Sequence, residues 1–191
     1  ASKRRNERSN HGDVQSRDRH EMRRARRREH SPLFWPHRAR VADREPLDDV
    51  PRNLERWMDA AVIRTFAQDR LVDIAQTTPR LRVVNALTNE EHPCQSLADM
   101  LTLAERWNGR FEGKRIAFVG DGNNVCTSLV HAAMMLGASV HVATPKQYEL
   151  PDEVVDQAAE VSQHGAGLTE FTDPKAAVRD VDAVYTDVWT S

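Results

Sequence analysis

Along most of the chain, apolar residues recur with two different periods, and these periods predict an alternating series of strands and helices. Short apolar runs, typical of buried strands, occupy 60–63, 81–84, 115–119, 139–143, 168–171 and 183–186. Segments with an apolar residue every three or four positions, typical of helices, occupy 50–58, 68–75, 93–107, 125–136, 152–164 and 174–179. Strands that alternate with helices predict an α/β fold with a parallel sheet and helices on both faces.

The first 44 residues follow neither period and differ sharply in composition from the rest. They hold 14 Lys and Arg against 6 Asp and Glu, so the remainder must be acidic to give the net charge of −2. The usual interpretation of such a segment is a solvated, disordered tail. The alternative is an arm that binds nucleic acid, because clustered Arg side chains neutralise phosphates. Interleaved aromatic residues and a known binding module are both missing, so a nucleic-acid partner is not expected.

Cysteine content and hydropathy restrict the classes of protein to consider. The chain has only Cys94 and Cys126, without a paired spacing, so neither a disulfide framework nor a zinc site is indicated. Two unpaired cysteines fit a reducing compartment, and we expect a cytoplasmic protein. No apolar run approaches the ~18 residues of a membrane span, and no signal-peptide core is visible, so no membrane partner is expected.

The junction after the second predicted strand carries the most informative side chains. Pro93 stands where a first helical turn tolerates proline, and apolar residues then recur at helical spacing at Leu97, Met100, Leu101 and Ala104. His92 and Gln95 are three apart and therefore lie on the same side of that turn. A helix N-terminus favours anionic ligands, and an imidazole and a carboxamide there could hold the carbonyl oxygen and the amine of a small substrate. The alternative is a histidine that only caps the helix or lies on the surface.

Other candidate residues follow predicted strands, where open α/β sheets place their ligands. Arg64 follows the first strand, with a surface ion pair as its alternative, and Asp187 follows the last, with a helix cap as its alternative. The loop Gly120–Asn124 invites a dinucleotide interpretation, but Val125 stands where that fingerprint needs its third glycine. NAD is therefore not expected, and the alternative is a tight turn that uses the glycines for positive φ.

Three segments together resemble a known family. The stretch Asn85–Asp99 resembles the His-Pro-x-Gln signature of the aspartate/ornithine carbamoyltransferase family, including the preceding Asn-x-Leu-Thr and the following Leu-Ala-Asp. The loop Gly120–Asn124 is similar to the one found in the ornithine branch of the family. The segment Asp187–Ser191 is similar to the family's Asp-x-Trp-x-Ser. The resemblance extends from Glu45 to Ser191.

The resemblance implies a division of the chain into parts of two domains. Residues 45–92 would be part of the carbamoyl-phosphate-binding α/β domain, 93–108 an interdomain helix, and 109–191 a Rossmann-like ornithine-binding domain, truncated at its C-terminus. Residues 1–44 would then be a disordered or frame-shifted segment, because the family's Ser-x-Arg-Thr-Arg phosphate loop is expected there and is missing.

The resemblance also implies the chemistry. The uncharged δ-amine of L-ornithine would attack carbamoyl phosphate and release phosphate, giving L-citrulline in arginine metabolism without a metal or an organic cofactor. By carry-over, Arg64 and His92 would be the catalytic donors to the carbonyl oxygen. Gln95 would orient the carbamoyl nitrogen and complete the carbamoyl-phosphate site. The expected ornithine-binding residues are Asn124, Asp187 and Ser191.

The family resemblance implies a homotrimer for the full-length enzyme. Because the phosphate loop is missing, we expect little or no activity from the chain as written. One alternative is a non-catalytic derivative that binds an amino acid or a partner. Another is a carbamoyltransferase for a related amine, such as putrescine or an acylated ornithine.

Overall fold

The computed structural model describes residues 49–187, and within them every pair of neighbouring strands is parallel. The strands are β1 (Ala60–Arg64), β2 (Arg82–Leu87), β3 (Arg115–Val119), β4 (Ser139–Ala143), β5 (Leu168–Phe171) and β6 (Ala183–Thr186). The helices are α2 (Asp49–Leu54), α3 (Gln68–Thr77), α4 (Pro93–Trp107), α5 (Asn124–Met135), α6 (Asp152–Val161) and α7 (Pro174–Ala177). The expected α/β fold with parallel strands is confirmed. The predictions for residues 1–44 and for Ser191 lie outside the described residues.

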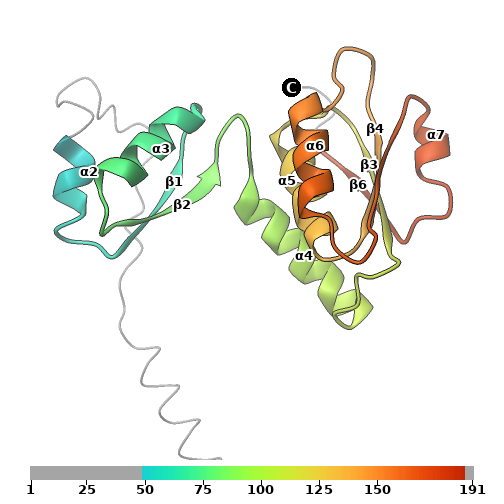
Figure 1. The fold of residues 1–191 in the computed structure, drawn as a ribbon, viewed down its shortest axis with the longest axis horizontal. Helices are drawn as coiled ribbons and strands as arrows, with labels where there is room; N and C mark the ends of the chain where they lie inside the picture. Colours follow the sequence, from blue (N-terminus) through green and yellow to red (C-terminus); the bar gives the residue numbers. More distant parts are fainter. Residues whose placement is uncertain (1–48, 188–191) are drawn as a thin grey trace, which may run out of the picture. The chain divides into compact units, whose positions relative to one another are not determined.

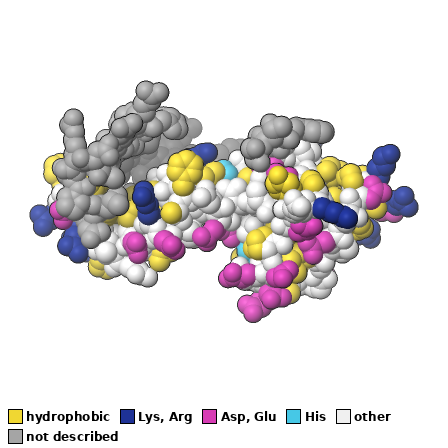
Figure 2. Space-filling view, turned by 90° about the horizontal axis from the view of Figure 1, so that it is seen from above, with side chains coloured by type: hydrophobic (Ala, Val, Ile, Leu, Met, Phe, Trp, Pro, Cys, Tyr) yellow, Lys and Arg dark blue, Asp and Glu magenta, His cyan; other side chains and the backbone are white. Residues whose placement is uncertain are grey.

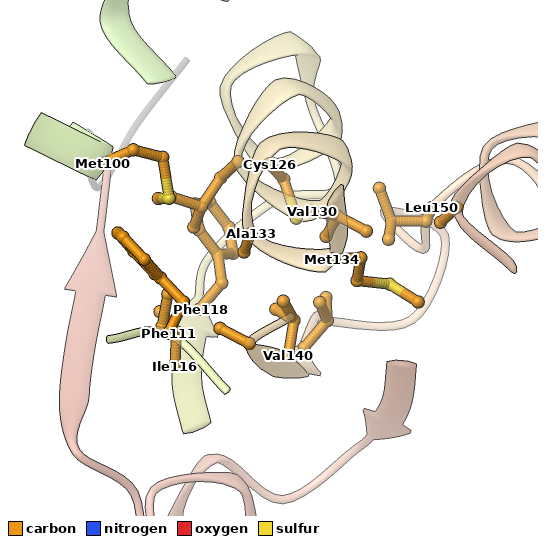
Figure 3. Packing of buried hydrophobic residues seen from close by; sticks show 14 residues of the cluster. Met100, Phe111, Ile116, Phe118, Cys126, Val130, Ala133, Met134, Val140 and Leu150 are labelled. Atoms are coloured by element: carbon orange, nitrogen blue, oxygen red, sulfur yellow. The ribbon is translucent and has the colours of Figure 1, made fainter. Parts of the chain in front are cut away.

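The larger sheet has the strand order β5-β4-β3-β6. In Figure 1, helices α5 and α6 lie on one face of this sheet and α7 lies on the other. Coverage of both faces explains why Ile116, Ala117 and Phe118 are buried in succession along β3, since a parallel strand covered on both sides has no solvent face. In β4 the buried residues are Val140, Val142 and Ala143. Phe118 and Val140 are fully buried, and they pack with Met134 of α5 in the core that Figure 3 shows.

The smaller sheet consists of β1 and β2 alone. Its register shifts between Ile63 and Arg64, so that Arg64 pairs with Leu87. Burial alternates along β1, and Val62 remains 69% exposed. The space-filling view in Figure 2 shows hydrophobic side chains (yellow) at the surface.

Three expected helices are shorter in the structure than the apolar pattern predicts, among them α7, which ends at Ala177 and not at residue 179. The first ends at Leu54, and Trp57 is 85% exposed beyond it. The helix expected to reach residue 164 ends at Val161, because Ser162 leaves the helical conformation with φ −58° and ψ 135°. After Leu54 the backbone continues as hydrogen-bonded turns, with the N–H of Met58 donating to the Leu54 carbonyl at 2.9 Å. No helix within residues 49–187 has the length and apolarity to cross a membrane.

Candidate functional site

The strand-to-helix junction predicted from the sequence is present at the start of α4. His92 is the residue before the first helical turn, Pro93 follows it, and no side chain caps the helix. The His92 ring is partly buried, and its Nδ1 makes no hydrogen bond among the described residues. The backbone N–H of His92 donates to Oγ of Ser128 at 2.8 Å. The predicted histidine therefore lies at an uncapped helix N-terminus, a position that favours an anion.

Gln95 lies one turn into α4 and is exposed. Its Nε2 donates to Oδ1 of Asp99 at 2.9 Å. Because a carboxylate can only accept, this bond fixes which end of the carboxamide faces Asp99. The carbonyl oxygen of Gln95 is therefore the end that can accept a hydrogen bond from a ligand.

Asp99 also links α4 to the neighbouring strand β6. Burial and the nearby Asp99 carboxylate raise the pKa of Tyr185 to about 12, so the phenol stays protonated at neutral pH. The Tyr185 ring stacks on Phe118, with ring centroids 5.7 Å apart. The hydrogen-bond partner of Gln95 thus lies beside a fixed aromatic side chain.

Arg64 ends β1, exposed to solvent, and no ion pair of it is found among residues 49–187. The chain beyond Arg64 runs beside the chain beyond β2. The N–H of Thr65 donates to the Leu87 carbonyl at 2.9 Å, and the N–H of Asn89 donates to the Phe66 carbonyl at 2.8 Å. Arg64 and the segment leading to His92 therefore emerge at the same end of the small sheet.

Asn124 and Asp187 both lie at the carboxyl edge of the larger sheet. Asn124 is the first residue of α5, and its Nδ2 donates to the Thr88 carbonyl at 2.5 Å. Asp187 follows β6 and accepts a hydrogen bond from Nδ2 of Asn123 at 2.9 Å. The neighbours Asn123 and Asn124 thus connect the loop after β3 to the ends of β6 and β2.

Sequence reasoning missed the role of Asn123. Its Oδ1 accepts from the N–H groups of Val125 and Cys126 at 3.0 and 3.2 Å, which makes it the N-cap of α5. Asn is a preferred N-cap residue, so the pair Asn123-Asn124 just before the predicted helix could have indicated this. Its bond to Asp187, 64 residues away, has no comparable signal in the sequence.

Position 122 requires glycine because there is no room for a Cβ atom, not because the backbone has a positive φ. A Cβ built there would lie 2.7 Å from the carbonyl carbon of Glu149 and from the nitrogen of Leu150. The N–H of Gly122 donates to the Tyr148 carbonyl at 2.7 Å, so the two loops lie backbone to backbone. The tight-turn alternative expected positive φ, which Gly120 has and Gly122 does not, so at Gly122 it is the close approach that requires glycine.

A second polar cluster, which sequence reasoning also missed, surrounds Glu91. Oγ of Ser128 donates to one oxygen of Glu91, and Nδ1 of His131 lies 3.2 Å from the other. The hydrogen bond to Glu91 raises the pKa of His131, although burial opposes this shift. No group of three or more His, Cys, Asp or Glu side chains that could hold a metal ion is found in the described part of the chain.

Two family profiles match the chain. The aspartate/ornithine carbamoyltransferase carbamoyl-P binding domain matches residues 30–105, and the Asp/Orn binding domain matches residues 112–191. The first match begins before Glu45, where the resemblance read from the sequence begins. The boundary between the two matches falls at the end of α4.

Curated relatives and solved structures agree with these profiles. The ornithine carbamoyltransferase of Acidothermus cellulolyticus is 49% identical over 150 residues, which cover 77% of this chain and 47% of that protein. The crystal structure of ornithine carbamoyltransferase from Gloeobacter violaceus is 44% identical with a TM-score of 0.72, covering 76% of this chain and 51% of that one. A structure of N-acetyl-L-ornithine transcarbamylase is 28% identical with a TM-score of 0.67, covering 75% and 48%. The chain spans about half the length of the curated relatives it matches.

Proposed function

Because the chain belongs to the aspartate/ornithine carbamoyltransferase family, we propose that it carries part of the active site of an ornithine carbamoyltransferase. The δ-amine of L-ornithine attacks the carbonyl carbon of carbamoyl phosphate, and the tetrahedral intermediate expels phosphate to leave L-citrulline. The observation that carries this proposal is the 2.5 Å hydrogen bond from Asn124 to Thr88. It joins the loop assigned to the amino acid to the segment assigned to carbamoyl phosphate.

In this proposal Arg64 and His92 donate to the carbonyl oxygen of carbamoyl phosphate. That oxygen gains negative charge as the tetrahedral intermediate forms, so fixed donors aimed at it lower the barrier. The uncapped first turn of α4 supplies a partial positive charge beside the same anion. These features support catalytic roles for both residues.

Gln95 would orient the carbamoyl amine. Asp99 engages the nitrogen end of its carboxamide, which leaves the oxygen end to accept from an N–H group. The carbamoyl nitrogen of the substrate has such N–H groups. The role assigned to Gln95 from the resemblance is therefore chemically consistent with its orientation.

Asn124 and Asp187 would hold the α-amino acid group of L-ornithine. Asp187 would attract the α-ammonium, and Asn124 would meet the same group with its side-chain oxygen, because its nitrogen is bound to Thr88. Ser191 stays a predicted third contact. Holding both substrates in register contributes a large part of the rate acceleration.

We further propose the cellular setting that the family resemblance implies. The full-length protein would be a cytoplasmic homotrimer in arginine metabolism, without a metal or organic cofactor. Its parts would be 45–92 for carbamoyl phosphate, 93–108 between the domains and 109–191 for ornithine.

The test is to assay citrulline formation and to titrate the chain with each substrate by calorimetry. We expect His92→Ala to weaken carbamoyl-phosphate binding and to abolish whatever citrulline formation the parent chain retains, and Asp187→Asn to weaken ornithine binding only. A protein that forms citrulline equally well without His92 would overturn the proposal. Binding of an amino acid with no response to carbamoyl phosphate would favour the non-catalytic alternative.

A second substrate class is testable in the same titration. The structure of N-acetyl-L-ornithine transcarbamylase, which is similar to this chain, concerns an acylated ornithine. We expect L-ornithine to bind more tightly than N-acetyl-L-ornithine or putrescine, because Asp187 would face an α-ammonium that both analogues lack. Equal affinity for putrescine would move the assignment to a related amine.

A further inference from the structure

Three polar residues of α5 lie on one face of the helix. Asn124, Ser128 and His131 are spaced i, i+4 and i+7, which places them in a single stripe. Each makes a hydrogen bond with the segment 88–92: Asn124 with Thr88, Ser128 with Glu91 and His92, and His131 with Glu91. This stripe therefore faces the residues that lead into α4.

Ser128 has the hydrogen-bonding capacity for both of its partners. A hydroxyl carries one proton and two lone pairs, so it can donate once and accept as well. Its proton goes to an oxygen of Glu91, and its lone pair accepts the backbone N–H of His92 at 2.8 Å. Because Glu91 takes the proton, the lone pairs are directed to the His92 side. Ser128 is only 3% exposed, so losing either bond would leave a buried polar group unpaired.

Glu91 is itself held from two directions. Its second oxygen lies 3.2 Å from Nδ1 of His131, and the two side chains are 28% and 17% exposed. Its backbone closes a turn with Thr88: the Thr88 N–H donates to the Glu91 carbonyl at 2.8 Å, and the Glu91 N–H donates to Oγ1 of Thr88 at 3.1 Å. The residue that directly precedes His92 is therefore fixed through both its backbone and its side chain.

We propose that Glu91, Ser128 and His131 form a polar clamp that positions His92 at the start of α4. Within the proposed function, on which this inference rests, the three are positioning residues, because they act on the backbone of His92 and not on the substrate. The clamp fixes the N–H of His92, and with it the direction in which the imidazole leaves the chain. Its loss would leave the imidazole chemically intact but misplaced, and misplacement by about 1 Å can cost on the order of a hundredfold in rate.

Amide hydrogen exchange at His92 tests the clamp directly, without any need for turnover. We expect Ser128→Ala to accelerate exchange of the His92 amide about tenfold, because the N–H loses its acceptor. Ser162→Ala is the matched control, since its hydroxyl bonds the Ala166 carbonyl outside the clamp. An unchanged exchange rate at Phe118 in β3 shows that the fold is intact. Unchanged exchange at His92 in Ser128→Ala would overturn the proposal.

A second variant removes the charge while keeping the size of the side chain. We expect Glu91→Gln to return the NMR titration of His131 toward that of an ordinary histidine and to raise the His92 exchange rate about threefold to tenfold. A His131 titration that is the same in both proteins would contradict the pairing with Glu91. This variant keeps the clamp testable even if Ser128→Ala fails to fold.

Steady-state kinetics then separate positioning from a purely structural role. We expect Ser128→Ala to lower the kcat of the citrulline formation that the parent retains about tenfold, with KM for ornithine unchanged. Ser128→Thr, which keeps the hydroxyl, should restore most of it. Equal losses in Ser128→Thr and Ser128→Ala would mean that packing, not the hydroxyl, matters. A parent protein that binds neither carbamoyl phosphate nor L-ornithine would refute the proposed function, whereas the exchange rate at His92 decides the clamp independently.

Discussion

The two sheets are built from the same kind of sequence, yet they bury their apolar residues very differently. In the larger sheet Ile116, Phe118 and Val140 are at most 1% exposed. In and after the first strand of the smaller sheet, Val62 is 69% and Phe66 is 80% exposed. Helices on both faces cover the larger sheet, whereas two strands with α2 and α3 cannot cover all of their own apolar surface. Strand pairing alone therefore does not make a core.

This difference in burial between the two sheets predicts which residues of the candidate site are held rigidly. Asn124 and Ser128 lie on α5, whose inner face is part of the large core, as Figure 3 shows for Cys126 and Val130. Arg64 ends a strand of the small sheet and is exposed. The segment 88–92 is held chiefly through its bonds to α5. We expect the larger sheet to dominate stability and the polar contacts of α5 to fix the site.

The largest loss of stability should come from the core of the larger sheet. Removing one phenylalanine side chain from each region tests this. Phe118→Ala opens a cavity in the core and should cost about 3–5 kcal/mol of unfolding free energy. Phe66→Ala, in the exposed region, should change it by less than about 0.5 kcal/mol. Urea denaturation followed by circular dichroism measures both. Similar losses in the two variants would show that the smaller sheet has a core of its own.

The next effect concerns the loop at the carboxyl edge of the larger sheet. Gly122→Ala places a methyl group against the backbone of residues 149–150 and should cost about 1–3 kcal/mol, because neither loop can yield easily. Gly167→Ala is the control, since nothing lies within 4 Å of its Cβ position. Thermal unfolding of the two variants should differ clearly. A Gly122→Ala protein as stable as the control would contradict the close approach.

A smaller effect depends on pH and on the clamp. The pKa of His131 is raised from 6.5 by its hydrogen bond to Glu91, against the opposing effect of burial, with further support from the Glu91 charge and the Val154 backbone. The pair therefore adds stability that is fully present below pH 6.5 and is lost as the pH rises through the raised pKa. The stability difference between the parent and Glu91→Gln should shrink between pH 6 and pH 8.5. A difference that stays constant over this range would mean that His131 does not titrate with Glu91.

The smallest effect lies at the opposite end of β3. Nζ of Lys114 lies 2.6 Å from Oδ1 of Asp182, and the Arg115 N–H donates to Oδ2. Asp182→Asn should cost about 0.2–1 kcal/mol at neutral pH. The hydrogen bond from Lys114 lowers the pKa of Asp182, so this contribution is present above pH 3.8 and is lost as the pH falls through the lowered pKa. Asp156→Asn on the exposed side of α6 is the control. An equal loss of stability in that variant would show that the ion pair between Lys114 and Asp182 does not stabilise the protein.

The order of helices and strands was well predicted from the sequence, because the spacing of apolar residues depends directly on whether the local backbone is helical or extended. It predicted less well which apolar residues are covered. Leu97, Met100 and Leu101 follow one helical pattern, but only Met100 is buried, while Leu97 and Leu101 are 67% and 63% exposed. A period identifies a helix and its apolar side, but coverage depends on which other elements pack there.

The candidate site shows the same division between local and distant information. The start of α4 at Pro93 and the placement of His92 before it were predictable from a few neighbouring residues. The bonds of Asn124 to Thr88 and of Ser128 to His92 join residues that are each 36 positions apart. The spacing of Asn124, Ser128 and His131 was visible in the sequence. Nothing in the sequence indicated that this face would meet Glu91.

The two cysteines differ in burial, and this gives the protein a built-in pair of chemical reporters. Cys126 is fully buried on α5, and burial raises the pKa of its thiol, so almost no thiolate is available to a reagent. Cys94 lies partly exposed beside Pro93 in the first turn of α4. An alkylating reagent should therefore label Cys94 first in the native protein and reach Cys126 only when the core opens. One labelling time course would follow the helix start next to His92 and the unfolding of α5 separately.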